Sequence, residues 1–315
     1  MCMNSEALTT VHFNPRLAVS RQHAVLSILR KEGVESVLDA GCGGGFVLGF
    51  LFSRACQKGG AAPSGLISNP EQTSEGVDIT CTDRLPLRRL GGIDLHLPSL
   101  MRASQSLALI AAETAAKHSE EDVAPASTVD ICTDLWHGSL LRPVPDYANF
   151  DAIVVSEVIE HLDEANLLLF GPMVFSMYRP RVVVVTTPNY SWAPYFDEPV
   201  DEAERLATRF KDPTGRTNRV FRHPDHKFEF TQEEFTEWAE GIAKTFGYTV
   251  EYGGVGNLPS YPTRRTGADA PAPPPNPETF YATQIATFRL EGASKEESKS
   301  PLHVASTRYV VEVDA

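Results

Sequence analysis

The stretch Val37-Leu-Asp-Ala-Gly-Cys-Gly-Gly-Gly45 decides the fold of this 315-residue chain. It is typical of a buried strand, at residues 36–39, that runs into a glycine turn and then into a helix at residues 46–56. Glycines let a backbone turn tightly and approach a ligand closely, because they lack the Cβ atom that would block it. Open α/β sheets bind ligands in the crevice at the carboxyl ends of their strands, which is where this turn would lie. On its own, the stretch is weak evidence for a particular ligand, and a nicotinamide-dinucleotide fingerprint and a structural turn are the alternatives.

Strand-like apolar runs alternate with helix-like stretches along the rest of the chain. This alternation predicts an α/β fold, with a mostly parallel sheet and helices on both faces. A first helix is expected at residues 16–31. The strands are expected at residues 36–39, 76–81, 129–136, 151–156, 181–186, 248–252 and 284–290. The class is therefore Rossmann-like, with seven strands.

Three stretches are expected to be loop insertions. Residues 58–74 are rich in Gly, Pro and Ser, and residues 84–127 are long for one crossover, although a helix is expected at 104–118. Residues 264–278 are rich in proline, which predicts an exposed loop. We expect one catalytic domain at residues 13–290, preceded by a flexible segment at 1–12. A polar tail at 291–315 follows it and includes a further strand at 307–313.

Composition and charge limit the class of protein. Five scattered cysteines without a Cys-x-x-Cys pair indicate a reducing compartment, expected to be the cytoplasm or also the nucleus. No apolar run is long enough to span a membrane. No secretory signal is expected, because the first residues lack a charged region followed by an apolar one. The net charge of −13 is unusual for a nucleic-acid enzyme, but residues 205–227 hold seven basic residues and two acidic ones. On charge alone, a solvated basic loop explains this stretch equally well.

Acidic residues near the glycine turn distinguish it from a dinucleotide fingerprint. Asp39 precedes the glycines, and the form Asp-x-Gly-x-Gly resembles the first motif of class I methyltransferases. Asp78, at the end of the expected second strand, would accept the ribose hydroxyls of a nucleoside cofactor, although it could also be a helix N-cap. The expected cofactor is S-adenosylmethionine. The residues expected to bind it are Asp39, Gly41, Gly43, Asp78, His137 and Ser139.

The end of the fourth strand carries Ser156-Glu-Val-Ile-Glu-His-Leu162. If a helix begins here, Glu157, Glu160 and His161 lie on one face at positions i, i+3 and i+4. Two carboxylates and an imidazole suit Mg²⁺, Mn²⁺ or a related ion. The alternative is that acidic residues simply favour the first turn of a helix, with His161 packed beside them.

A second unusual stretch is Phe221-Arg-His-Pro-Asp-His-Lys-Phe-Glu-Phe230, which holds two histidines in a basic and aromatic setting. It is followed by Thr231-Gln-Glu-Glu234, the signature of a helix that begins with a capping box.

Taken in order, these and other motifs resemble the methyltransferase domain of the Hua-enhancer family, which methylates the 2′-hydroxyl at the 3′ end of small RNAs. The resemblance runs from about residue 13 to residue 290. The pair formed by Glu-Val-Ile-Glu-His and Asp-His-Lys-Phe-Glu is its most specific part. The other matching motifs are Phe13-Asn-Pro15, Arg21, Gly76-Val-Asp-Ile79, His137-Gly-Ser139, Thr187-Pro-Asn189, Trp238-Ala239, Gly247-Tyr-Thr-Val-Glu-Tyr252, Gly254-Val-Gly256 and Thr283-Gln-Ile-Ala286.

The resemblance implies a seven-stranded class I methyltransferase sheet with an antiparallel last strand. It also implies a metal ion, Mg²⁺ or Mn²⁺, which is bound by Glu157, Glu160, His161 and His226. Glu160 and His161 are the expected catalytic residues, with His161 as a ligand first and a base second. His223 lies outside the matching motif and is expected to contact RNA or to support a ligand.

The implied substrate is the 3′ end of a small RNA, and an Argonaute-type protein is the partner expected to deliver it. The residues expected to bind this substrate are Arg21, Asn189, Arg222 and Lys227. A metal-independent class I methyltransferase that acts on a small molecule or a protein is the alternative, with Glu160 and His161 as an acid/base pair.

Overall fold

One eight-stranded sheet organises the computed structural model, which describes residues 13–56, 85–120, 131–196, 202–257, 274, 276–293 and 308–312. The strand order is β10-β3-β2-β1-β4-β5-β9-β8, and all neighbours pair in parallel except β9, which is antiparallel to β5 and β8. This order confirms the predicted fold class, and β10 adds an eighth strand beside β3. The strands of the sheet are β1 (Ser36–Ala40), β2 (Arg89–Asp94), β3 (Cys132–His137), β4 (Ala152–Ser156), β5 (Val182–Pro188), β8 (Tyr248–Asn257), β9 (Tyr281–Leu290) and β10 (Arg308–Glu312).

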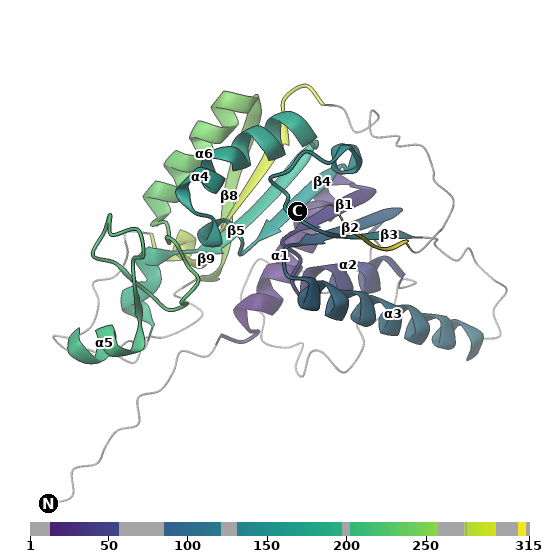
Figure 1. Cartoon of the computed structure of the whole chain (residues 1–315), viewed down its shortest axis with the longest axis horizontal. Helices are drawn as coiled ribbons and strands as arrows, with labels where there is room; N and C mark the ends of the chain where they lie inside the picture. The colour runs from purple at the N-terminus through teal and green to yellow at the C-terminus, as the bar shows by residue number, and fades with distance from the viewer. Residues whose placement is uncertain are drawn as a thin grey trace, which may run out of the picture.

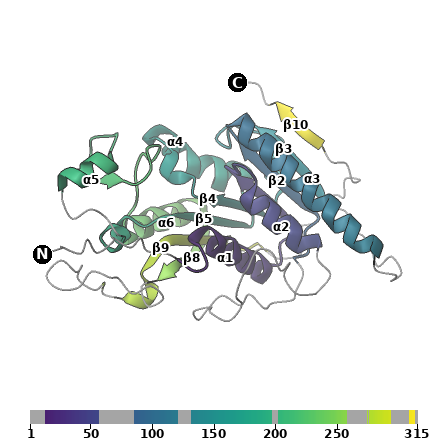
Figure 2. The same ribbon diagram turned by 90° about the horizontal axis from the view of Figure 1, so that it is seen from below.

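Helices cover both faces of the sheet, as Figures 1 and 2 show. One face carries α1 (Leu17–Glu32), α2 (Phe46–Cys56) and α3 (Leu97–Glu120). The other face carries α4 (Glu164–Gly171), the π-helix η3 (Pro172–Tyr178) and α6 (Gln232–Phe246). Outside these layers lie α5 (Glu202–Thr208) and a small ribbon of β6 (Phe210–Lys211) and β7 (Val220–Phe221). Single turns complete the fold at η1 (Pro145–Asn149), η2 (Ile159–His161), η4 (Tyr190–Tyr195) and η7 (Pro277–Thr279).

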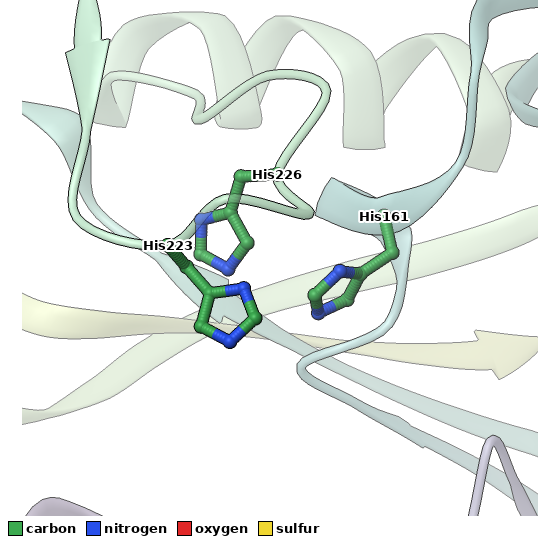
Figure 3. Close-up of side chains that lie close together, drawn as sticks. All are labelled: His161, His223 and His226. Carbon is green, nitrogen blue, oxygen red and sulfur yellow. The ribbon is translucent and has the colours of Figure 1, made fainter. Parts of the chain in front are cut away.

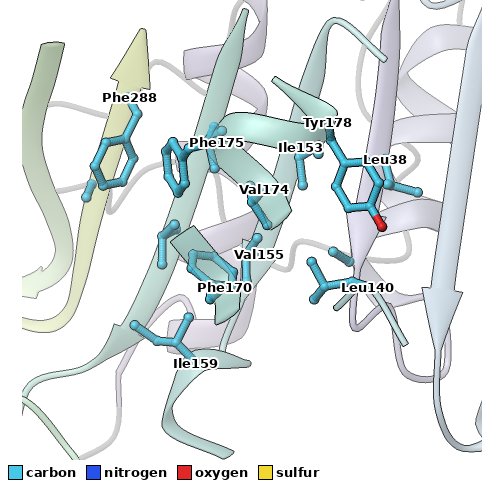
Figure 4. Packing of buried hydrophobic residues seen from close by; sticks show 14 of the residues in the cluster. Leu38, Leu140, Ile153, Val155, Ile159, Phe170, Val174, Phe175, Tyr178 and Phe288 are labelled. Carbon is cyan, nitrogen blue, oxygen red and sulfur yellow. The ribbon is translucent and has the colours of Figure 1, made fainter. Parts of the chain in front are cut away.

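The valine run of β5 shows how the sequence builds these layers. Successive side chains of a strand point to opposite faces. Val182 and Val184 pack in the cluster under α1 and α2, whereas Val183 and Val185 pack in the cluster under η3 and α6. Figure 4 shows the second cluster, in which Phe175 of η3 packs against the sheet. A strand buried on both faces therefore reads as a continuous apolar run.

The second strand is the place where the sequence-based prediction was wrong. Residues 84–127 are no insertion, because β2 and α3 lie within them and β2 pairs with both β1 and β3. Glycines usually weaken strands, but here large neighbours fill both faces. A Cβ on Gly91 would lie 2.6 Å from the Phe150 ring, and one on Gly92 would lie 2.5 Å from Leu48. The glycine pair is therefore part of the packing.

Several other predictions fall on residues that are not described. They are the flexible segment at 1–12, the insertion at 58–74, the strand at 76–81 and most of the loop at 264–278. Among the described helices, none is long and apolar enough to cross a membrane.

Candidate active site

The glycine turn between β1 and α2 has a backbone that glycine adopts most readily. Gly41 has a φ of 79° and Gly43 a φ of 52°. The N–H groups of Gly41 and Cys42 donate to the carbonyl oxygen of Ile93, at 2.8 and 3.0 Å. A Cβ on Gly41 would lie 2.5 Å from a methyl carbon of Val158, whereas one on Gly43 would meet no atom within 4 Å. The turn therefore touches the segment after β4 on one side and faces open space on the other.

Two carboxylates stand beside this turn. Asp39, on β1, is 2 % exposed, and its Oδ2 atom has no hydrogen-bond partner within the protein. Asp94, at the end of β2, accepts the N–H of Gly43 through Oδ2 at 2.7 Å. Burial, and then the charge of Asp94, raise the pKa of Asp39 to about 7. A buried acceptor without a partner beside a glycine turn can receive a hydrogen bond from a ligand.

Among the described residues, the acidic residue at the end of the strand beside β1 is therefore Asp94, in the place that the sequence predicted for Asp78. Residue 78 lies outside the described residues, while β2 occupies the position beside β1 that the sequence analysis gave to residues 76–81. Both segments carry a glycine, a β-branched residue and an aspartate in order. The local pattern therefore could not separate the two segments.

His137 and Ser139 reach the same edge of the sheet. Nε2 of His137 lies 3.1 Å from the carbonyl oxygen of Leu95, just after β2. The hydroxyl of Ser139 accepts the N–H of Leu141 at 3.1 Å and so shapes the turn after β3. The structure therefore groups both residues with Asp94 and the glycine turn.

Glu157 and Glu160 follow β4, but not on the helical face that the spacing predicted. Glu157 has a φ of 58°, in the left-handed region that residues with side chains rarely adopt. Residues Ile159–His161 form one 3₁₀ turn, and α4 begins only at Glu164, after the N-cap Asp163. The helical spacing argument was therefore wrong, and an irregular turn sets the directions of these side chains. Backbone strain of this kind is found at functional sites.

Threonines at the end of β5 bind both carboxylates. Thr186 donates to Oε1 of Glu157 and Thr187 to Oε2 of Glu160, each at 3.0 Å. Arg21 pairs with Oε2 of Glu157 at 3.3 Å, whereas Oε1 of the fully buried Glu160 has no partner within the protein. Burial raises the pKa of both carboxyl groups, and the charge of Glu157 adds to this effect at Glu160. A nearby cation would offset the free-energy cost of burying these two carboxylates.

His161 and His226 come together from distant parts of the chain (Figure 3). Their ring centroids are 4.9 Å apart. Nδ1 of His226 lies 2.7 Å from Oε1 of Glu229, and the N–H of Lys227 donates to the carbonyl oxygen of Glu160 at 2.7 Å. Burial, and then the neighbouring His226, lower the pKa of His161. The ring is therefore neutral at neutral pH, which is the form that binds metals.

A third histidine joins this pair. Ligand nitrogen atoms of His161, His223 and His226 all lie within 4.8 Å of one another. Among the described residues, neither Glu157 nor Glu160 belongs to this compact set. Sequence reasoning placed His223 outside the ligand set and missed Glu229, whose only signal was its place three residues after His226.

Two of the four expected substrate residues are engaged within the protein. Arg21 pairs with Glu157, as described above. Asn189 is 3 % exposed, donates to the carbonyl oxygen of Tyr281 and accepts the N–H of Ser191, both at 2.9 Å. The structure therefore gives Asn189 a structural role as the N-cap of η4, and its assignment to substrate binding stays a prediction.

The other two residues, Arg222 and Lys227, lie on the loop that carries the histidines. Arg222 is exposed and its guanidinium stacks over the ring of Phe196, 3.6 Å from the centroid. Arg219, from the same basic stretch, instead makes two bonds to Glu234, at 2.8 and 2.9 Å. That glutamate closes the capping box of α6, as the sequence predicted. At least part of the basic stretch thus has a structural role.

Comparison with known proteins supports a particular family. No family model matches the chain. The small RNA 2′-O-methyltransferase of Schizosaccharomyces pombe is 31% identical over 278 residues, which cover 88% of this chain and 61% of that protein. The Arabidopsis thaliana protein of the same name is 27% identical over 93% of this chain and 24% of its own length. The chain thus spans less than two thirds of these curated relatives.

Solved structures agree on the fold. The methyltransferase domain of bacterial CtHen1 superposes with a TM-score of 0.54 and 22% identity, over 87% of this chain and 100% of that domain. The small RNA methyltransferase HEN1 superposes with a TM-score of 0.60 and 24% identity, over 94% of this chain and 28% of that protein. At these identities the likeness concerns the fold.

The strand order and the glycine turn define the fold, which is that of the class I methyltransferases. The curated relatives that the chain resembles are small RNA 2′-O-methyltransferases.

Proposed function

We propose that this chain transfers a methyl group from S-adenosylmethionine to the 2′-hydroxyl of the 3′-terminal nucleotide of small RNAs, with a bound Mg²⁺ or Mn²⁺ ion. The observation that carries the proposal is the contact of Val158 with Gly41. Val158 belongs to the turn that bears both carboxylates, and Gly41 to the turn that would bind the methyl donor. The two reactants would therefore be neighbours. Similarity to proteins named small RNA 2′-O-methyltransferases supports the choice of substrate.

The residues beside the glycine turn fit a nucleoside cofactor. The carboxylate of Asp94 accepts the N–H groups of Gly43 and His96, and each oxygen retains a lone pair for a ribose hydroxyl. Asp39 offers a buried oxygen without a partner. The open space at Gly43 lets the cofactor approach the backbone. His137 and Ser139 line the adjoining turn, where an adenine ring would lie.

The residues at the end of β4 fit a divalent cation. Glu160 is 0 % exposed and has an oxygen without a partner, which is costly unless a positive charge compensates it. We assign Glu157, Glu160, His161 and His226 as the residues that would hold the metal. When bound, the ion would lower the pKa of a ribose hydroxyl and so produce a better nucleophile. Glu229 holds the ring of His226 through Nδ1 and leaves Nε2 for the ion.

His161 has two chemical capacities in this arrangement. Its lowered pKa keeps an unprotonated nitrogen at neutral pH. A nitrogen that is bound to a metal cannot accept a proton as well. We therefore assign His161 first as a ligand, and as a proton acceptor only through a nitrogen that is not so bound.

The RNA would lie over the loop after β7. Lys227 follows His226 directly, and Arg222 is exposed at the start of the same loop. Such side chains bind phosphate groups, and the affinity would fall as salt rises. We propose that an Argonaute-type protein delivers the RNA in the cytoplasm or the nucleus.

Transfer of a labelled methyl group to two short RNAs tests the proposal. One RNA ends in a ribose with both hydroxyls, and the matched control differs only by a terminal 2′-deoxyribose. We expect transfer to the first RNA alone, and we expect EDTA to abolish it. Activity that survives EDTA, or that ignores the terminal 2′-hydroxyl, would instead indicate a metal-independent methyltransferase with another substrate.

A further inference from the structure

We propose that His223 is a third imidazole ligand of the cation site and that it makes the site prefer a transition metal ion, such as Co²⁺, over Mg²⁺. The proposal rests on the proposed function only because it needs a cation at the end of β4. It adds a ligand and a metal preference that the four assigned ligands do not imply.

The position of the His223 ring supports this role. Its centroid lies 5.1 Å from that of His226, with an interplanar angle of 30°. It stands edge-on to His161 at 5.7 Å and 88°. In Figure 3 the three rings surround one space, and a nitrogen of His223 faces the ring of His226. The side chain of His223 is 53% exposed, so hydrophobic burial does not explain why it lies there.

The loop that carries His223 is anchored at both ends. Phe221, just before it, is 1% exposed and pairs with Phe210 in the β6–β7 ribbon. After it, the N–H of Lys227 donates to the carbonyl oxygen of Glu160. A ring on such a short, tied segment is held near the cluster, which reduces the entropy cost of binding a metal.

The hydrogen bond of His223 leaves a nitrogen in the form that binds metals. The N–H of Asp225 donates to Nδ1 of His223 at 3.3 Å, so this nitrogen carries a lone pair and no proton. The bond is long and therefore weak. A metal ion could replace it at little cost.

Ligand chemistry then predicts the preference. Oxygen ligands suit Mg²⁺, which also retains several waters, whereas imidazole suits later transition ions. Two carboxylates with two imidazoles form a mixed site. A third imidazole would favour an ion such as Co²⁺ and would add little to the binding of Mg²⁺.

Metal binding to the purified full chain tests this without RNA or cofactor. Calorimetry would measure the affinities of Co²⁺ and Mg²⁺, and visible absorption would report the ligands of bound Co²⁺. We expect His223→Ala to weaken Co²⁺ binding about tenfold or more, with a changed spectrum, and Mg²⁺ binding less than about twofold. Equal effects on both ions, or no effect on Co²⁺, would overturn the proposal. His96→Ala, at another exposed histidine, is the matched control and should change neither affinity.

A second variant separates this proposal from the proposed function. His226→Ala should abolish Co²⁺ binding, since His226 is a ligand under both. If His226→Ala abolishes Co²⁺ binding while His223→Ala has no effect, the cation site is supported and the assignment of His223 as a third imidazole ligand is wrong. If His226→Ala leaves binding intact, both are wrong. Unchanged circular dichroism and melting midpoints would show that each variant is folded.

Discussion

The two halves of the candidate site are built in different ways. The cofactor half consists of the glycine turn after β1 and the carboxylates of Asp39 and Asp94, and the N–H groups of the turn donate to Asp94 and to the carbonyl oxygen of Ile93. The metal half joins the turn after β4 to a loop after β7, through side chains and a single backbone bond from Lys227 to Glu160. The cofactor half is thus formed by neighbouring strands of the sheet, whereas the metal half depends on tertiary contacts between segments that are distant in the sequence.

This difference has a functional consequence. The halves touch where Val158 meets Gly41, yet no described hydrogen bond or ion pair joins Asp39 or Asp94 to Glu157 or Glu160. We therefore expect cofactor binding and metal binding to be largely separable, so that damage to one half leaves the other intact.

The largest expected effect comes from Glu160. Replacing it with Ala removes the buried carboxylate, so we expect methyl transfer to fall roughly a thousandfold, equivalent to several kcal/mol. Cofactor affinity, measured by calorimetry, should change less than about twofold. Loss of cofactor binding in a folded variant would show that the halves are not separable.

The next effect concerns stability and pH in the cofactor half. The pKa of Asp39 is raised from 3.8 to about 7, so the unfolded state ionises first as pH rises. Without ligand, the contribution of Asp39 to stability should be fully present below about pH 4 and should be lost as the pH rises to about 7. Asp39→Asn should remove this loss, up to about 4 kcal/mol at pH 7, as measured by denaturant unfolding. An unchanged pH profile would show that Asp39 is not the group responsible.

A substitution of Asp94 tests which acidic residue binds the cofactor. Asp94→Ala removes the carboxylate that holds Gly43, and we expect cofactor affinity to fall about tenfold or more. Asp78→Ala is the matched control and should change affinity less than about twofold. Loss of cofactor affinity in Asp78→Ala but not in Asp94→Ala would instead support Asp78, as the sequence predicted.

The sequence predicted the cofactor half's first strand and turn because their pattern is local. It failed at β2, since Gly91 and Gly92 lack the β-branched residues of a typical strand and depend on Phe150 and Leu48 to fill the space. The resemblance to a family supplied the pairing of His161 with His226, which no spacing rule could give. The left-handed backbone of Glu157 was also beyond prediction, because it is imposed by tertiary contacts.

The smallest effect separates the two kinds of basic residue. Lys227→Ala should weaken RNA binding about threefold and reduce its salt dependence, because it removes one phosphate contact. Arg219→Ala should instead lower the free energy of unfolding by about 1 kcal/mol, since it breaks a partly exposed ion pair with Glu234. Fluorescence anisotropy and chemical unfolding would measure the two. Equal effects of both variants on RNA binding would contradict this division.

Resistance of the RNA product to periodate tests the central claim most directly. Periodate cleaves a terminal ribose with two free hydroxyls, and a 2′-O-methyl group prevents this. After incubation with the protein, S-adenosylmethionine and Mn²⁺, we expect the RNA to become resistant, and we expect EDTA or Glu160→Ala to leave it sensitive. RNA that stays sensitive under all metal conditions, although the cofactor binds, would contradict the account.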